Sequence, residues 1–492
     1  MSSGGRARGI VLKNAVANVV NGGSGALLAV VLPPFLIRHL SQDAYSVWVL
    51  VLQLGAYTNL LAFGIQVAVG RYVAHAKELG DTTQRDRILG TAILALSGSA
   101  LLAVLAFGIG AQYLPQLFPK IPITFLGDAK ICLLWVGGSL ALGLPFLAFA
   151  GYFMGLQRYE VPAGISLVAR SLTAIGVVLA VRHGEGLVGM GKAFAIGNLI
   201  SYALQAIAFQ MIRRREGGHL ARPTWGTARE LAGYCYSLVV WNLAMVMISG
   251  LDIIIVAWLD FRSVGPYTVA AAIVAFMGGA QNALFGVLVP VSAVLGAQND
   301  ETRLGTMLVR ATRYSVWILL AMGLPLWLAA SPLLRAYAGA SFGPQTVWLL
   351  RVLVLANMIR LTATPYAVIL LGTGQQRLMT ITPIVEGVVN VTLSILLGLR
   401  FGAVGVAWGT VFGATMAIAL NLLYNMPRTR SIACDRGLYL RQGLVRPLAS
   451  AVPVMLGATV AHILPGMAGW LALGAGTLIS IVDVGRRINA PG

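Results

Sequence analysis

Residues 380–424 read TITPIVEGVVNVTLSILLGLRFGAVGVAWGTVFGATMAIALNLLY. This stretch decides the fold, because it holds two apolar runs, 380–399 and 403–424, each long enough to cross a bilayer as a helix. We therefore expect two consecutive membrane-spanning helices. Glu386 is the only acidic residue in the stretch. Small residues recur at every fourth position of the second run, a spacing that lets helices pack closely; they are Gly405, Gly409 and Gly413.

The rest of the chain has the same apolar character. Of its 492 residues, 58% are hydrophobic and 10% are charged, whereas about a quarter of the residues in a soluble domain are charged. A globular core cannot hide this much apolar surface, because surface-to-volume scaling forces polar residues outward. The net charge of +19 does not indicate nucleic acid, because the positive residues lie in short clusters between apolar runs. The composition predicts an all-α polytopic membrane protein without an appreciable soluble domain.

Walking along the chain gives about 14 transmembrane helices. The first follows three basic residues and is too long for the core of a signal peptide. The apolar segments lie near 16–37, 45–69, 90–111, 129–153, 163–181, 193–212, 234–258, 267–295, 314–330, 347–371, 380–399, 403–424, 447–464 and 468–484.

The positive residues predict the orientation of these helices. If the N-terminus lies in the cytoplasm, the richest basic clusters, 71–87, 213–229 and 428–446, all fall on the cytoplasmic side. The bias continues to Arg486 and Arg487, which predicts an even number of spans and two cytoplasmic termini. The resulting division is an N-terminal six-helix bundle (1–212), a cytoplasmic linker (213–233), a C-terminal six-helix bundle (234–424), a cytoplasmic loop (425–446) and helices 13–14 with a short tail (447–492).

The two six-helix bundles resemble each other in sequence. Because six spans separate equivalent points, the repeat is parallel, with its axis along the membrane normal. Paired bundles of this kind enclose a cavity that can open to either side, which favours transport over a scaffolding role. The repeated elements are Gly155-Leu-Gln157-Arg158 with Gly374-Gln-Gln376-Arg377, and Gly186, Gly189 and Gly197 with Gly402, Gly405 and Gly413.

Charged residues inside spans mark a transport pathway or an ion pair, because unpaired charges are costly there. Five occur: Arg170, Asp252, Arg351, Arg360 and Glu386. Arg351 stands beside Trp348 at the start of its span, so we expect it to extend to the interface. Arg170 and Arg360 remain as the deep cations.

Polar side chains at helical spacing accompany these charges. Guanidinium groups suit phosphate, so Arg170 and Arg360 are candidates to bind a pyrophosphate. Asp252 and Glu386 are candidates to couple transport to H⁺ or Na⁺. Alternatively, the charges only pair with one another, for instance Arg170 with Glu386 or Arg360 with Asp252. The amide side chains that suit sugar hydroxyls are Asn18, Asn21, Asn198, Gln205, Asn357 and Asn390.

Enzymatic motifs are weak. The run from Gly186 to Lys192 resembles a phosphate-binding loop, but Ala193 replaces the Ser or Thr that holds Mg²⁺. The five histidines form no metal-binding set, and the three cysteines show no metal spacing. We therefore expect no catalytic residues, no metal site and no cofactor, and we do not interpret the chain as an enzyme.

A series of short motifs runs through the chain in a characteristic order: Pro33 to Arg38-His39-Leu40, Tyr45 and Trp48, Gly64, Arg71-Tyr72-Val73-Ala74, Gly155-Leu-Gln157-Arg158-Tyr159, Gly265-Pro-Tyr267 and Pro290. By these motifs the chain resembles the polysaccharide-transport, or oligosaccharide flippase, family, which is related to multidrug extrusion transporters and lipid II flippases. The family pattern is changed at Leu40-Ser41 and Tyr45-Ser46, where Leu-Gly and Tyr-Gly are usual.

The resemblance implies translocation of a polyprenyl-pyrophosphate-linked oligosaccharide repeat unit across the bacterial inner membrane by alternating access. It implies a role in the biosynthesis of O-antigen, capsule or exopolysaccharide, with a polysaccharide polymerase and export proteins as candidate partners. The partners would also include membrane lipids but no nucleic acid. Two alternatives remain open: a cation-coupled multidrug antiporter of the same fold, and a membrane-embedded polysaccharide polymerase or ligase. The antiporter would favour acidic cavity residues, and the polymerase would need a larger outward loop than the sequence offers.

Overall fold

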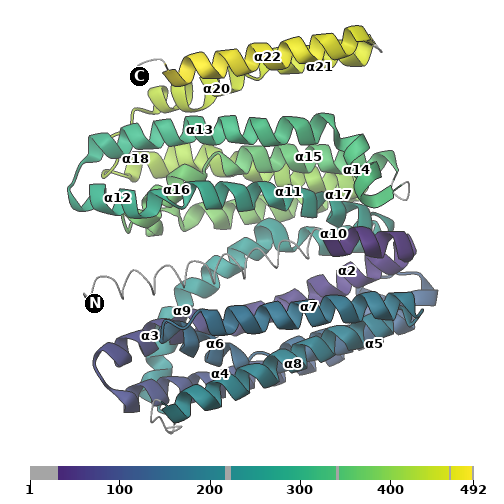
Figure 1. Ribbon diagram of the computed structural model, residues 1–492, viewed down its shortest axis with the longest axis vertical. Coiled ribbons are helices and arrows are strands. Elements are labelled where there is room, and N and C mark those ends of the chain that lie inside the picture. Colours follow the sequence, from purple (N-terminus) through teal and green to yellow (C-terminus); the bar gives the residue numbers. More distant parts are fainter. Residues whose placement is uncertain (1–30, 216–222, 340–342, 465–466, 490–492) are drawn as a thin grey trace. The chain divides into compact units, whose positions relative to one another are not determined.

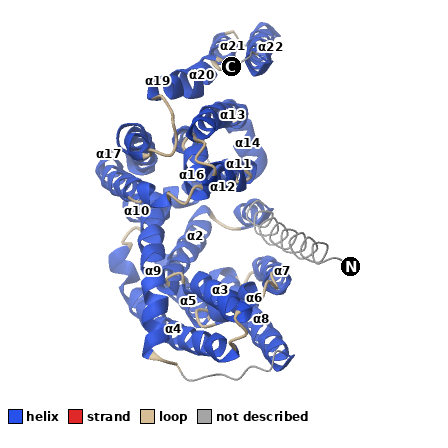
Figure 2. Cartoon of the chain, turned by 90° about the vertical axis from the view of Figure 1, so that its left-hand side faces the viewer, coloured by secondary structure: helices blue, strands red, loops and turns tan. Residues whose placement is uncertain are grey.

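The computed structural model describes residues 31–215, 223–339, 343–464 and 467–489. Within these ranges, helices are the only regular secondary structure (Figure 2), which confirms the predicted all-α class. Most of the predicted first span lies outside the described residues, although residues 31–39 are helical. The predicted sugar-binding residues Asn18 and Asn21 also lie outside them.

Eleven helical segments of the described chain are long and apolar enough to cross a membrane. One of them, Arg377–Arg428, covers both predicted spans of the quoted stretch, and the helix is interrupted within it at Gly402 (φ 62°). Two shorter apolar helices, Phe146–Gly155 and Leu288–Ala297, complete other predicted spans. The chain is therefore a multi-pass membrane protein, while the number of 14 spans stays a prediction.

The chain divides into two compact units. Unit 1 comprises Met1–Val246 and Ile253–Thr268. It includes α9, which the sequence division placed in the C-terminal bundle, because α9 packs against α3 and α4. Its helices (Figure 1) are α2 (Gln42–Ala56), α3 (Ile65–Glu78), α4 (Thr82–Leu117), α5 (Ile123–Leu142), α6 (Phe146–Gly155), α7 (Glu160–Arg182), α8 (Gly186–Arg215), α9 (Trp225–Met245) and α10 (Asp252–Leu259), of which Asp252 itself belongs to unit 2.

Unit 2 comprises Met247–Asp252 and Val269–Gly492. Short π-helical turns occur at Val246–Gly250, Asn421–Asn425 and Tyr439–Val445. The helices are α11 (Val264–Phe285), α12 (Leu288–Ala297), α13 (Glu301–Leu328), α14 (Ala330–Ala338), α15 (Pro344–Leu361), α16 (Thr364–Gly372), α17 (Ile381–Leu420), α18 (Met426–Arg428), α19 (Arg436–Leu438), α20 (Arg446–Ala449), α21 (Val452–Ile463) and α22 (Met467–Asn489).

The turn after α3 recurs after α12. Each helix ends on a residue with positive φ, Gly80 (69°) and Asn299 (53°), a conformation that only Gly and Asn adopt readily. The following aspartate caps the next helix in both cases. Asp81 Oδ1 accepts a hydrogen bond from the backbone N–H of Gln84 at 2.8 Å, and Asp300 Oδ1 accepts one from that of Arg303 at 3.0 Å. The same local chemistry thus sets two equivalent turns.

A second turn recurs after α6 and α16, and it corrects the register of the repeat. Gln157 (φ 60°) and Gly374 (φ 75°) occupy the same left-handed position, each followed by a residue whose N–H closes the preceding helix. Gly374 is therefore equivalent to Gln157, not to Gly155 as the matching letters suggested. The alignment by letters was wrong by two residues because the turn is defined by backbone geometry. The match between Gly186 (φ 63°) and Gly402 (φ 62°) is confirmed.

The core of unit 1 combines alanines, branched aliphatic side chains and a few aromatic rings. Phe149 stacks on Phe209 with ring centroids 4.4 Å apart, and Tyr152 meets Phe209 edge-on at 5.4 Å. Tyr152 and Phe153 are fully buried. Burial of an aromatic ring stabilises a core through its large contact area and through ring pairing. These contacts tie α6 to α8 within unit 1.

Candidate functional site

Close packing within α17 creates the setting of the site. The helix is interrupted at Gly402, and its second half lies against its first. A Cβ on Gly409 would collide with the backbone and hydroxyl of Ser394, and one on Gly413 would lie 3.0 Å from the Cβ of Asn390. The predicted packing role of these glycines is confirmed, and their small size brings polar groups of both halves together.

The π-helical turn Val246–Gly250 supplies backbone acceptors to the same place. A π-helical turn shifts the hydrogen-bond pattern and leaves carbonyls free for other donors. Asn390 Nδ2 donates to Ile248 O at 2.7 Å and to Met247 O at 3.2 Å. Asn390 is completely buried, so these bonds satisfy an amide that has no access to water. The turn thereby fixes the residues that lead into Asp252.

Asp252 lies at the centre of this group. Its Oδ1 accepts from Asn390 Nδ2 at 3.3 Å, and its Oδ2 accepts from Thr410 Oγ1 at 3.2 Å. Ser394 Oγ lies 3.2 Å from Asn390 Oδ1 and 3.1 Å from Val406 O. We call Asp252, Asn390, Ser394 and Thr410 the polar cluster. All four are buried, so the cluster concentrates one carboxylate and several neutral oxygens inside a membrane protein.

Arg360 and Glu386 form a second polar feature of unit 2. Arg360 Nε donates to Glu386 Oε1 at 2.6 Å, which joins the last turn of α15 to α17. The side chain of Glu386 is 7% exposed and that of Arg360 is 20% exposed. Arg360 Nη2 is buried and donates no hydrogen bond within the described structure. Glu386 thus binds the Nε edge of the guanidinium, while Nη2 keeps hydrogen-bond donors that no described residue uses.

The predicted amide residues of the described chain differ in setting. In unit 1, Asn198 Nδ2 donates to Ser139 Oγ at 3.1 Å, and Gln205 Nε2 donates to Ser201 Oγ at 3.3 Å within α8. In unit 2, Asn357 Nδ2 donates to Leu353 O of its own helix, α15. The structure brings Asn390 together with Asp252.

The two remaining predicted cations also differ in setting. Arg170 is exposed on α7 of unit 1. The guanidinium of Arg351 lies 5.7 Å from the centroid of the Trp348 ring, and its Nε donates to Trp327 O at 3.2 Å; its position at the membrane interface stays a prediction. Of the two arginines on α15, only Arg360 reaches a carboxylate of the described structure.

Sequence reasoning missed Thr410 and the Val406 carbonyl. Thr410 was overlooked because the glycine spacing of its span pointed to packing alone. The sequence signal that could have identified Thr410 is its position next to Gly409. Because Gly409 lies at a close helix contact, the side chain that follows it lies near the edge of that contact. The π-helical turn before Asp252 had no recognisable sequence signal, because it depends on acceptors and donors distant in the chain.

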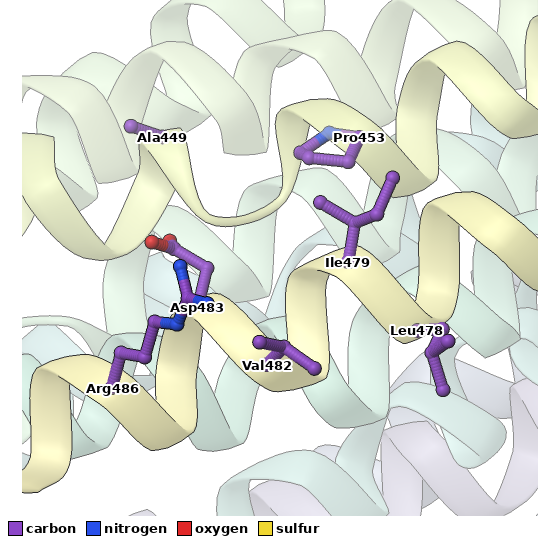
Figure 3. Close-up of a pocket in the computed structure, with 7 residues that line it drawn as sticks. All are labelled: Ala449, Pro453, Leu478, Ile479, Val482, Asp483 and Arg486. Carbon is purple, nitrogen blue, oxygen red and sulfur yellow. The ribbon is translucent and has the colours of Figure 1, made fainter.

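A separate cavity of about 510 Å³ lies between α20, α21 and α22 (Figure 3). Its wall is apolar except for Asp483 and Arg486, whose side chains point toward each other. None of the predicted binding residues lines it. In the described part of the chain, no group of three or more His, Cys, Asp or Glu residues is arranged to hold a metal ion.

The fold defines the class of protein. The lipid II flippase MurJ, in an inward closed conformation, matches with a TM-score of 0.72 and 14% identity over 96% of this chain and 98% of that one. An inward-facing multidrug resistance transporter of the MATE family matches with a TM-score of 0.65 and 15% identity over 82% and 94%. A MOP superfamily transporter from Pyrococcus furiosus matches with a TM-score of 0.54 and 14% sequence identity, over 85% of this chain and 95% of that one. The chain thus has the fold of the MOP superfamily of membrane transporters.

A family model matches the central region of the sequence. Residues 156–347 match the family described as Polysaccharide biosynthesis protein. No curated protein matches the chain. The family match, which covers less than half of the chain, and the fold both agree with the resemblance that the motifs predicted.

Proposed function

We propose that the protein translocates a polyprenyl-pyrophosphate-linked oligosaccharide repeat unit across the bacterial inner membrane by alternating access, for the biosynthesis of O-antigen, capsule or exopolysaccharide. The pyrophosphate and sugars of such a molecule cannot cross hydrocarbon unaided, because each unpaired polar group costs about 2–7 kcal/mol. A polar pathway through the protein replaces water for the head group while the lipid tail stays in the bilayer. The family match of residues 156–347 supports this substrate class.

The observation that carries the proposal is the setting of Arg360. Glu386 holds one edge of the guanidinium and fixes its orientation, and the buried Nη2 retains a donor for an anionic ligand. An arginine presents several donors in one plane, which suits a phosphate group. In this proposal Arg360 binds the pyrophosphate within unit 2, and Asn357 of the same helix contributes a hydrogen bond to the sugars. For Arg170, Asn198, Gln205, Asn390, Asn18 and Asn21, the roles expected from the sequence stay predictions.

Arg360→Ala tests the assignment, and Arg351→Ala is its matched control on the same helix. Translocation of a lipid-linked oligosaccharide into proteoliposomes should be abolished by Arg360→Ala and retained by Arg351→Ala. Because Arg360→Ala leaves a buried carboxylate, Arg360→Ala/Glu386→Gln is measured in parallel. Retention of wild-type translocation by either Arg360 variant would overturn the proposal.

The polar cluster supports coupling of this transport to a cation. Carboxylate, amide, hydroxyl and carbonyl oxygens are the ligands that hard cations prefer, and buried carboxylates in transporters serve ion and proton pathways. In the proposal Asp252 binds Na⁺ or a proton with help from Asn390, Ser394 and Thr410. Glu386 serves the coupling indirectly, since its carboxylate is engaged by Arg360. No other cofactor is needed.

A multidrug antiporter is less well supported than a flippase. A cationic drug requires an accessible acidic group, whereas Asp252 and Glu386 are both buried and hydrogen-bonded. The MATE transporter also matches the fold with a lower TM-score than the lipid II flippase does. An enzymatic polymerase or ligase has no support in these comparisons.

The proposed topology places both termini and the loops 71–90 and 213–233 in the cytoplasm. A cysteine at exposed Thr83 should resist a membrane-impermeant maleimide added to intact cells, whereas one at exposed Pro119 should react. Native cysteines interfere little: Cys132 and Cys235 are buried, and burial together with Asp435 raises the pKa of the Cys434 thiol to about 11. Little reactive thiolate is then present at neutral pH. Labelling at position 83 would show that this loop faces the outside and would contradict the proposed orientation.

A further inference from the structure

A groove of about 450 Å³ lies within unit 2, between the end of α11, the start of α12 and the first half of α13. It contains none of the residues of the polar cluster and neither member of the Arg360–Glu386 pair. One wall is apolar and the other combines apolar and cationic side chains. The lining residues are Leu284, Phe285, Leu288, Arg303, Thr306, Met307, Arg310, Ala311 and Tyr314.

The sequence of α13 places this groove at a membrane interface. Arg303, Met307, Arg310 and Tyr314 recur at helical spacing and therefore share one face of α13. From residue 315 to Leu328 the helix contains no charged residue, so its charged beginning meets the head-group level and its remainder enters hydrocarbon. Tyr314 marks the boundary, as aromatic residues with a polar atom do at bilayer interfaces.

The cations of the groove have unequal internal partners. Arg303 forms an exposed pair with Asp300 at 3.3 Å. Arg310 forms no ion pair or hydrogen bond with the described residues. In the next turn, Arg313 Nε is buried without a hydrogen-bond partner in the described structure, beside the rings of Tyr314 and Trp317. The donors at this level of α13 therefore exceed the acceptors that the described residues provide.

The chemistry of the groove defines its occupant. An anionic group is required by the cations, and an apolar attachment is required by Leu284, Phe285 and Leu288. A guanidinium binds phosphate through two parallel hydrogen bonds, and basic residues at a bilayer surface attract anionic lipids by roughly 1 kcal/mol each. We propose that this groove binds the phosphate of one anionic phospholipid at Arg310, with the start of its acyl chains against the α11–α12 wall. This site is independent of the transported substrate.

Native mass spectrometry of the purified full chain tests the proposal, with phosphatidylglycerol and phosphatidylcholine as probes. The wild-type protein should retain phosphatidylglycerol at least fivefold better than phosphatidylcholine. Arg310→Gln should remove that preference, and Leu288→Gln should weaken retention of phosphatidylglycerol. The matched control is Arg430→Gln, an exposed arginine on the same predicted side of the membrane, which should behave as wild type.

Three results would overturn the site. The first is equal retention of the two lipids by the wild-type protein. The second is an equal loss in Arg310→Gln and Arg430→Gln, which would reveal general charge attraction. The third is an equal rise of the protein's unfolding temperature on adding inorganic phosphate or phosphatidylglycerol, which would indicate a site for a soluble anion. Since Arg310 is exposed, its variant should unfold at the wild-type temperature without added lipid, which separates binding from folding.

Discussion

Units 1 and 2 share their turns but differ in their interiors. The turns at Asp81 and Asp300 have the same cap, and those at Gln157 and Gly374 have the same left-handed backbone. Inside, unit 1 pairs aromatic rings, as between Phe149 and Phe209, and buries an ion pair of adjacent residues, Arg85 and Asp86. Unit 2 buries the polar cluster and the Arg360–Glu386 pair, which join distant segments. The turns thus preserve the register of the repeat while the interiors have taken different chemistry.

One helix contact shows how this difference is accommodated. In unit 1, a Cβ on Gly176 would lie 3.1 Å from the Cβ of Ala193, so glycine stands on the first helix and alanine on the second. In unit 2 the glycine lies on the second helical segment instead: Gly409, in the second half of α17, faces Ser394 in the first half. Each contact uses a small residue. The second also involves a hydroxyl, as does the contact between Gly197 and Thr173 in unit 1. Close packing and polar chemistry are therefore coupled in unit 2.

The largest expected effect comes from removing the charge of the polar cluster. Asp252→Asn keeps the shape of the side chain and removes its negative charge, so cation-coupled translocation should fall by about 100-fold or more, as losses of key electrostatic contacts do. Ser139→Ala in unit 1 removes a polar contact of comparable burial and should change the rate less than about twofold. Proteoliposomes with an imposed Na⁺ or proton gradient provide the measurement. Equal losses in both variants would end the functional contrast between the units.

Breaking the ion pair of unit 2 should produce the largest loss of stability. Glu386→Ala leaves Arg360 without its partner, which typically costs about 3–5 kcal/mol for a buried pair. The thermal unfolding midpoint in detergent should drop clearly. Arg170→Ala, at an exposed position of unit 1, should shift it little.

The double variant Glu386→Leu/Arg360→Met removes both charges and should recover most of the lost stability. If Glu386→Ala unfolds at the wild-type temperature, the pair does not stabilise unit 2. If the double variant is as unstable as the single one, the loss arises from packing rather than from an unpaired charge.

Gly409→Ala should have a smaller effect on stability. The added Cβ collides with Ser394, and overpacking of this kind costs about 1–3 kcal/mol. The control is Gly98→Ala in α4 of unit 1, where a Cβ meets nothing within 4 Å; there we expect a gain of about 0.5–1 kcal/mol from helix propensity. Unfolding temperatures compare the two. A neutral Gly409→Ala would show that the halves of α17 separate without cost.

The smallest expected effects concern the shared turns. Asp81→Ala and Asp300→Ala each remove a helix cap and should destabilise their units by about 1 kcal/mol. Because the two caps have the same geometry, their effects should agree within about 0.5 kcal/mol. Amide exchange at the first turns of α4 and α13 measures each cap locally. A large difference between the two turns would show that their equivalence is only geometric.

The sequence was sufficient to predict the helical membrane class and many of the apolar helices. Apolar runs and basic clusters carry this information residue by residue. The pairing of Arg360 with Glu386 was foreseeable as a kind of contact but not as a particular pair, because the two cations and two carboxylates that the sequence placed deep in spans allow several pairings. Thr410 and the carbonyls near Ile248 escaped prediction because their roles depend on a kinked helix and a π-helical turn.

The shared turns also preserve a history. The distance along the chain between equivalent residues is 219 positions for Asp81 and Asp300, 217 for Gln157 and Gly374, and 216 for Gly186 and Gly402. Duplication of an ancestral module accounts for the change in this spacing from 219 to 216 positions. Small deletions or insertions would have been tolerated between the turns but not within them. The turns therefore serve as fixed reference points for aligning the sequences of distant relatives. In such an alignment, the residues found at the positions of the polar cluster would show at which stage the second module acquired the carboxylate of Asp252.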